Sequence, residues 1–191
     1  MSLVSSVTNS KHPVVKLEDF QGLKIRTIQN PVFVDVFNTL GVNASPIAFT
    51  EVHAALESKA PDGRQTPYNI IDTSRFHEVQ KYLSAAKHIN GPGVVRVGKK
   101  FWDQLGGDEK KILRDTCAEA RDYERKASRD LDVKVLAEMK AKGLLVNDIS
   151  AKARARMRDK FKPVIEKYTA VVGLELVKQA YAEIERVRKQ K

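Results

Sequence analysis

The stretch that most constrains the fold of this chain covers residues 108–142 and contains no glycine and no proline. Its apolar residues recur at helical spacing, acidic residues open it, lysines close it, and Gly143 follows it. Such charges suit the helix dipole, and glycine is common just past a helix end. The pattern predicts one continuous helix about 50 Å long. A helix longer than one small lobe indicates an element that braces two lobes.

The residues before this stretch alternate between strand-like and helix-like patterns. Residues 22–27 are typical of a strand, and Asn30 followed by Pro31 indicates a helix start, because asparagine caps helices and proline suits their first position. This alternation predicts the α/β class. The further elements expected are a strand at 44–49, a helix from Thr50, a short strand at 64–66, a helix at 74–83, a buried strand at 94–97 and, after a loop at 143–150, a last helical region with a kink or restart at Pro163.

Charge narrows the classes of partner. Lysine and arginine outnumber aspartate and glutamate 34 to 24, which gives a formal charge of +10 and favours anionic partners such as nucleic acid, acidic lipid and organic acids. No apolar run is long enough to predict a transmembrane helix. Residues 1–10 have neither a basic leader nor an apolar block, so we expect no secretory signal in them.

Histidine and cysteine often bind metals or act in catalysis, but in this sequence they do not occur in the patterns that those roles require. The histidines, His12, His53, His77 and His88, do not have metal-ligand spacing. Cys117 is the only cysteine and lies within the predicted long helix, so neither a disulfide nor an activated thiol is expected. No glycine-rich phosphate loop and no nucleophile elbow is present. We therefore expect no enzyme activity, no metal and no cofactor.

Three successive predicted strands end in side chains that suit a small-acid site. Arg26 ends the first strand four residues before Asn30, and a guanidinium beside a helix start could hold a carboxylate. The alternative is that Arg26 forms an ordinary surface salt bridge, and the sequence pattern alone favours this alternative. Phe49 ends the second strand, where it could wall a pocket or simply fill the core. The third strand end carries polar side chains, namely Arg64, Gln65 and Thr66.

A basic stretch at residues 152–162 raises the alternative of a nucleic-acid-binding module, because clustered cations displace counterions from phosphates. On a helix, however, alternate residues lie about 200° apart, so these cations fall on different sides. Apolar residues lie between them at helical spacing: Met157, Phe161, Val164, Ile165 and Tyr168. This spacing favours a solvated helix that flanks a core, and no nucleic-acid partner is expected.

Several segments, in this order along the chain, resemble the solute-binding proteins of TRAP (tripartite ATP-independent periplasmic) transporters, the DctP-like family. They are residues 8–13, 17–26, 46–56, 76–82 and 100–103. The resemblance covers nearly the whole chain. It implies a periplasmic binding protein-like fold of two α/β lobes that close over a ligand, and a function in capturing a small organic acid, such as a dicarboxylate, for a membrane permease. It also implies that Arg26 pairs with the substrate carboxylate and that Phe49 lines the pocket.

The resemblance further implies how the chain is divided. The expected parts are a crossover segment from the first lobe at 1–15, the second α/β lobe at 16–90, a hinge strand and return at 91–107, and the long helix with a carboxy-terminal helical region at 108–191. A periplasmic location is inherited from the family in the same way.

Two departures from the family pattern stand out. The family usually has Gly-Gln-Glu-Asn-Pro where this chain has Gly63, Arg64, Gln65, Thr66 and Pro67, so Thr66 replaces a ligand-binding asparagine and Arg64 adds a cation. Family members also carry much of the first lobe before the point where this chain begins. A truncated form would expose first-lobe surfaces, so we expect self-association as a homodimer, or a fragment that binds nothing.

Overall fold

The computed structural model describes the backbone of residues 2–189, with the side chains from Ser5 onward other than those at positions 90 and 92. Its centre is a six-stranded mixed sheet in the order β4-β3-β5-β2-β6-β8. Strand β3 is parallel to β4 and β5, β6 is parallel to β8, and β2 is antiparallel to β5 and β6. The strands are β2 (Ser6–Asn9), β3 (Lys24–Thr27), β4 (Asn43–Pro46), β5 (Gly63–Thr66), β6 (Tyr82–Ala85) and β8 (Leu145–Asp148).

Helices cover both faces of this sheet, which confirms the α/β class. One core contains Ile25, Phe37 and Met157, and the other contains Ile71, Leu83 and Met139. The helices are η1 (Leu17–Phe20), α1 (Pro31–Asn38), η2 (Phe49–Glu51), α2 (Val52–Glu57), α3 (Tyr68–Thr73), η3 (Phe76–Glu78), α4 (Lys99–Gln104), α5 (Gly107–Ala141), α6 (Ala151–Val172) and α7 (Leu174–Arg188). Helices α1 and α6 pack on the first core, and α2, α3 and the end of α5 on the second.

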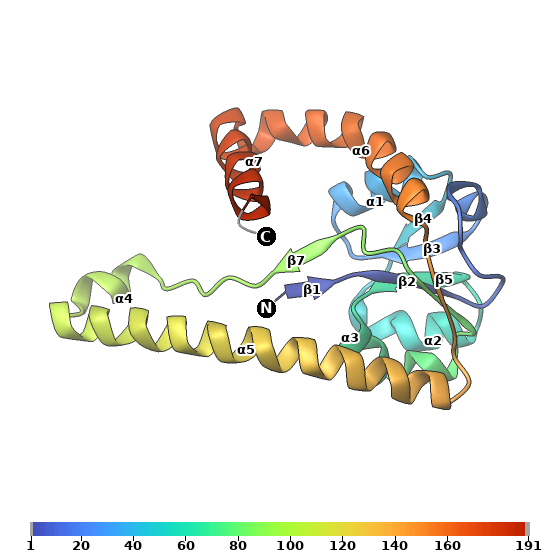
Figure 1. The fold of residues 1–191 in the computed structure, drawn as a ribbon, viewed down its shortest axis with the longest axis horizontal. Coiled ribbons are helices and arrows are strands. Elements are labelled where there is room, and N and C mark those ends of the chain that lie inside the picture. The colour runs from blue at the N-terminus through green and yellow to red at the C-terminus, as the bar shows by residue number, and fades with distance from the viewer. Residues whose placement is uncertain (1, 190–191) are drawn as a thin grey trace.

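A two-stranded ribbon leaves the sheet on one side. Strand β1 (Ser2–Val4) pairs antiparallel with β7 (Asn90–Pro92), and the two continue β2 and β6 beyond the sheet (Figure 1). Residues 1–15, predicted to be a crossover segment, therefore include β2 between the two halves of the sheet. The boundaries predicted for the other parts stay a prediction.

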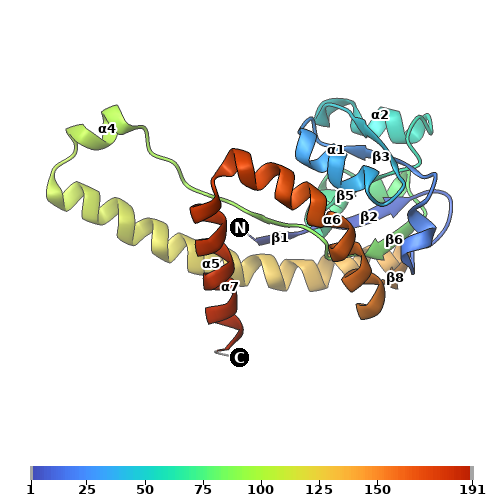
Figure 2. The same cartoon turned by 90° about the horizontal axis from the view of Figure 1, so that it is seen from above.

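The long helix is confirmed as α5, with Glu109 accepting a hydrogen bond of 2.7 Å from the backbone N–H of Gly106 at its start. Only its carboxy-terminal part packs on the sheet, where Val135 and Met139 are buried. Tyr123, on the same apolar stripe, is 77% exposed. Figures 1 and 2 both show the amino-terminal part of α5, together with α4, extending away from the sheet. The helix is therefore half core element and half projecting arm.

The helix predicted at 74–83 is wrong. Arg75 adopts a left-handed conformation with φ of 55°, which ends the helical run after α3, and only the single turn η3 follows. The next residues form β6, which lies between β2 and β8. Pairing with strands distant in sequence has overridden the local helical pattern.

Three further expectations in the second half of the chain need correction. The buried strand predicted at 94–97 is wrong, since no strand forms there and Val94 and Val95 are each 76% exposed. Of the kink or restart predicted at Pro163, the restart does not occur, because α6 is continuous through it and a new helix begins only after Gly173, whose φ is 103°. The loop predicted at 143–150 contains strand β8.

Candidate functional site

Two buried arginines lie side by side on neighbouring parallel strands. Arg26 of β3 and Arg64 of β5 are register partners, so their side chains project from the same face of the sheet. Each residue is only 2% exposed. A buried guanidinium without a counterion is costly, so two together at one sheet edge need a physical explanation.

Arg26 is held from one side by a backbone carbonyl. Its Nε and Nη2 donate hydrogen bonds of 2.9 and 2.5 Å to the carbonyl oxygen of Ile47, which follows β4. Its Nη1 is buried without a partner among the described residues. Burial lowers the pKa of the guanidinium from its usual value. The carbonyl fixes the orientation of the side chain but does not neutralise its charge.

Arg64 is held by aromatic rings. Its Cζ lies 4.1 Å from the ring centroid of Phe76 and 5.6 Å from that of Phe49, which is cation–π geometry. His53 stacks on Phe76 with the ring centroids 6.1 Å apart. Within the described part of the chain, Arg64 Nε and Nη1 are buried with no hydrogen-bond partner. Burial, and then repulsion from Arg26, lowers the pKa of Arg64 to about 9.

Both arginines line a cavity of about 250 Å³ at this sheet edge. Phe49, Gln65 and Thr66 also line it, and its walls are otherwise mainly apolar, with Ile28, Phe33, Pro67, Ile70, Ile89, Ser5 and Gly91. No aspartate or glutamate is among these described lining residues. The Gln65 side-chain amide donates to the hydroxyl of Ser5. A small cavity with apolar walls and two unneutralised cations can accept an anionic ligand.

The structure thus brings five of the six predicted site residues to one cavity: Arg26, Phe49, Arg64, Gln65 and Thr66. Phe49 begins η2 instead of ending a strand, and it is 53% exposed. Asn30 is not brought to the cavity; its side chain accepts a hydrogen bond of 2.9 Å from Val32 N and caps α1. Sequence reasoning missed Phe76 and Ser5, and no local pattern marks either residue as part of a site.

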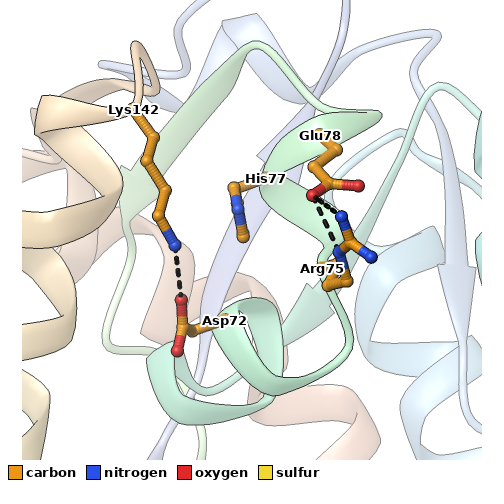
Figure 3. Close-up of a pocket in the computed structure, with 5 residues that line it drawn as sticks. All are labelled: Asp72, Arg75, His77, Glu78 and Lys142. Atoms are coloured by element: carbon orange, nitrogen blue, oxygen red, sulfur yellow. Dashed lines mark hydrogen bonds and ion pairs between the residues drawn. The ribbon is translucent and has the colours of Figure 1, made fainter.

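In a second hollow, of about 590 Å³, the cationic side chains are neutralised by acidic ones. In Figure 3, Arg75 points at Glu78, with an N–O distance of 2.7 Å, and Lys142 points at Asp72 at 3.5 Å, with His77 between the two pairs. Each cation in this hollow therefore has an acidic partner. The contrast with the Arg26–Arg64 cavity favours the latter as the ligand site.

Two cations of the basic stretch on α6 also pair with carboxylates of the chain. Arg156 pairs with Glu18 at 2.6 Å, and Lys162 pairs with Asp159 at 2.8 Å. Of the apolar residues predicted to form a stripe between these cations, Met157, Phe161 and Val164 are buried, but Ile165 is 42% exposed. The described residues hold no group of three or more histidine, cysteine or acidic side chains arranged for a metal. None of the described helices combines the length and apolar character needed to cross a bilayer.

Comparison with known proteins identifies the family. The family described as bacterial extracellular solute-binding protein, family 7 (DctP), matches residues 4–170. The chain belongs to this family. The resemblance drawn from the sequence is thereby confirmed, and with it the periplasmic binding protein-like fold. Members of the DctP family are solute-binding proteins.

Individual relatives of the DctP family show the extent of the similarity. The chain is similar to the 2,3-diketo-L-gulonate-binding periplasmic protein YiaO of Escherichia coli, with 35% identity over 77% of this chain and 45% of that protein. It is 44% identical to a TRAP periplasmic solute binding protein from Ochrobactrum anthropi, with a TM-score of 0.91, covering 100% of this chain and 59% of that one. The sugar acid binding protein DctPAm from Advenella mimigardefordensis, in complex with galactonate, gives 39% identity and a TM-score of 0.83 over 93% of this chain and 57% of that one. The chain spans about half the length of the curated relatives it matches.

Proposed function

We propose that this chain is part of the solute-binding subunit of a TRAP-type transporter and captures a small organic acid without bond chemistry. The observation that carries the proposal is the cavity with two buried, unneutralised arginines, Arg26 and Arg64. Relatives are named for binding 2,3-diketo-L-gulonate, C4-dicarboxylate and sialic acid, and related structures hold galactonate or galacturonate. All of these ligands carry a carboxylate.

In this proposal four of the cavity residues have the following roles. Arg26, fixed by the carbonyl of Ile47, supplies a buried positive charge that attracts the carboxylate. Phe49 and the apolar wall pack against the carbon skeleton of the ligand. Gln65 and Thr66 lie where hydroxyl or keto oxygens of the ligand can be recognised by hydrogen bonds.

Thermal unfolding with a panel of acids tests the proposal directly. Mono- and dicarboxylic acids, sugar acids and keto acids are added to the wild type, to Arg26→Gln and to Arg129→Gln, an exposed arginine on α5 that serves as the matched control. An acid at a hundredfold its Kd should stabilise the wild type and the control by roughly 2.7 kcal/mol and leave Arg26→Gln unshifted. If no acid raises the midpoint, or if Arg26→Gln responds like the control, the assignment is wrong.

The partners follow from the same reasoning. TRAP transporters contain membrane permease subunits, and we propose that such a permease receives the ligand and that the protein works in the periplasm, as relatives with periplasmic names do. Co-purification of the full-length binding subunit with its permease in detergent, with and without ligand, measures this contact. Absence of any ligand-dependent association would count against it.

We also propose that this form of the chain self-associates. Large apolar side chains are exposed on several elements outside the sheet, and exposed apolar surface favours association. The most exposed are Val94, Val95, Tyr123, Val133 and Val171. Sedimentation velocity at increasing concentration should show a dimer, and Tyr123→Glu should weaken it. A monomer at all concentrations would contradict this proposal without affecting the ligand site.

A further inference from the structure

We propose that Arg64 is a specificity-determining residue of the cavity and that it selects ligands carrying two negative charges over ligands carrying one. This inference rests on the proposed function, because it assigns a second anion contact within the same cavity. The resemblance drawn from the sequence implies glutamine at this position, and this chain has Arg64 there.

Neither buried arginine is neutralised by an acidic side chain of the described residues. Arg26 and Arg64 are both 2% exposed, and no ion pair among the described residues involves either of them. The cavity lining contains no acidic side chain within the described part of the chain. A ligand with a single carboxylate would leave the site with one uncompensated buried cation, whereas a ligand with two acid groups would compensate both. Since an uncompensated buried charge is strongly unfavourable, the site should prefer the doubly charged ligand.

The two arginines also differ in how many of their hydrogen-bond donors lack a partner. The Ile47 carbonyl occupies Nε and Nη2 of Arg26, so only Nη1 of that residue lacks a partner. Arg64 contributes two further buried nitrogens without partners, Nε and Nη1. More of the unsatisfied donor capacity therefore belongs to Arg64 than to Arg26. A ligand that contacted Arg26 alone would leave these Arg64 donors buried and unpaired.

Aromatic side chains also orient the guanidinium of Arg64. Arg64 lies over the ring of Phe76 at 4.1 Å, and Phe76 in turn stacks with His53 and meets Phe49 edge-on with ring centroids 6.3 Å apart. This support holds the guanidinium in place before the ligand arrives, so little side-chain entropy is lost on binding. A preorganised cation discriminates between ligands more sharply than a flexible one.

Two ligand pairs of matched skeleton test the inference. D-Erythronate is compared with meso-tartrate, and galactonate with galactarate; within each pair the terminal CH₂OH becomes a second carboxylate. Calorimetric titration of the wild-type chain should give at least tenfold tighter binding of the diacid in one or both pairs. Arg64→Gln should reduce that ratio to threefold or less, mainly by weakening the diacid. Arg129→Gln, on α5, should keep the wild-type ratio.

Salt separates the local effect from the overall charge of +10. Titrations repeated at 0.5 M sodium chloride should keep the preference if it arises from the buried pair, because buried charges are screened little. A preference that disappears at high salt, or that Arg129→Gln reduces as much as Arg64→Gln does, overturns the inference.

The outcomes distinguish this inference from the proposed function. If monoacid and diacid bind the wild type equally well and Arg26→Gln abolishes both, the proposed function stands and the role of Arg64 is refuted. If neither class binds, the proposed function of the chain fails and the inference with it. Should Arg64→Gln fail to fold by circular dichroism, Arg64→Lys supplies the test. It keeps the charge but loses the planar stacking on Phe76, so it should retain a diacid preference that is smaller than in the wild type; complete loss or full retention refutes the role assigned to the stacked guanidinium.

Discussion

His88 should make the stability of the fold depend on pH between neutrality and pH 4. Its ring meets that of Phe37 edge-on with centroids 5.4 Å apart, and both ring nitrogens are buried without partners among the described residues. The small cavity beside it, of about 60 Å³, is lined by the cationic side chains Lys87, Arg154 and Arg158 and by no acidic residue of the described chain. Burial lowers the pKa of His88 to about 4.

The sign and size of the effect follow from this pKa. The unfolded chain takes up a proton as the pH falls through about 6.5, while folded His88 resists protonation down to about 4. The folded state therefore loses stability across this interval, and the loss is complete below it. Between pH 7 and pH 5 the loss from this residue is about 2 kcal/mol, and it approaches about 3 kcal/mol near pH 4.

Urea unfolding of the wild type and of His88→Leu at pH 7 and pH 5 measures this loss. The wild type should lose about 2 kcal/mol more than the variant over that range, because the other titrating groups are common to both and cancel. His12→Gln, which removes an exposed histidine, should behave like the wild type. If the wild type and His88→Leu lose the same free energy of unfolding, the ring is not held neutral by burial and the reasoning is refuted.

Five other substitutions test the packing, each by urea unfolding at pH 7. Gly63→Ala should lower the free energy of unfolding by about 3 kcal/mol or prevent folding, because a Cβ there would lie 1.9 Å from a backbone oxygen of β2. Gly98→Ala is the control and should lower it little, because Gly98 has open space around it. Equal effects would contradict the close approach at Gly63. In monomeric protein, Met139→Ala should lower the free energy of unfolding by about 2–5 kcal/mol, and Tyr123→Ala should lower it by less than about 0.5 kcal/mol. If Tyr123→Ala has the larger effect, α5 packs on the rest of the protein through its amino-terminal part. Asn30→Ala should cost about 1 kcal/mol through loss of the cap on α1, and no change would show that the cap is dispensable.

The elements that the sequence predicted correctly are those specified by neighbouring residues. Asn30 and Pro31 start α1 because the cap and the proline ring act within one turn. The long helix likewise follows from uninterrupted helical spacing and from charges at its own ends. In both cases the interactions that decide the structure lie a few residues apart, so a linear pattern contains them.

The elements that the sequence failed to predict depend on distant partners. Strand β8 has only four residues, and it forms because Leu145 to Asp148 pair in parallel with Tyr82 to Ala85. The same pairing turns a segment with helical spacing into β6. Conversely, the valines at 94 and 95 resemble a strand but have no neighbouring strand within the described structure, and they stay exposed. Strand propensity decides little when no partner is present.

The candidate site depends partly on local sequence and partly on contacts between distant residues. Each cavity residue could be proposed from its place at a strand end, but the closeness of Arg26 and Arg64 follows from the register of β3 and β5, which no single segment encodes. The support of Arg64 by Phe76 depends on the turn that Arg75 makes after α3, where the local pattern predicted a continuing helix.

The site is also where the fold departs furthest from what stability alone would favour. Two cationic side chains, Arg26 and Arg64, are buried without acidic partners in the described chain, although exposed arginines such as Arg75 and Arg156 pair with carboxylates. Aspartate and glutamate are not scarce, since the chain has 24 of them. Since neither buried arginine has such a partner, a ligand would have to supply the balancing negative charge. Such a local conflict within an otherwise consistent fold is typical of a binding site, and it supports the proposal that this cavity binds an anion.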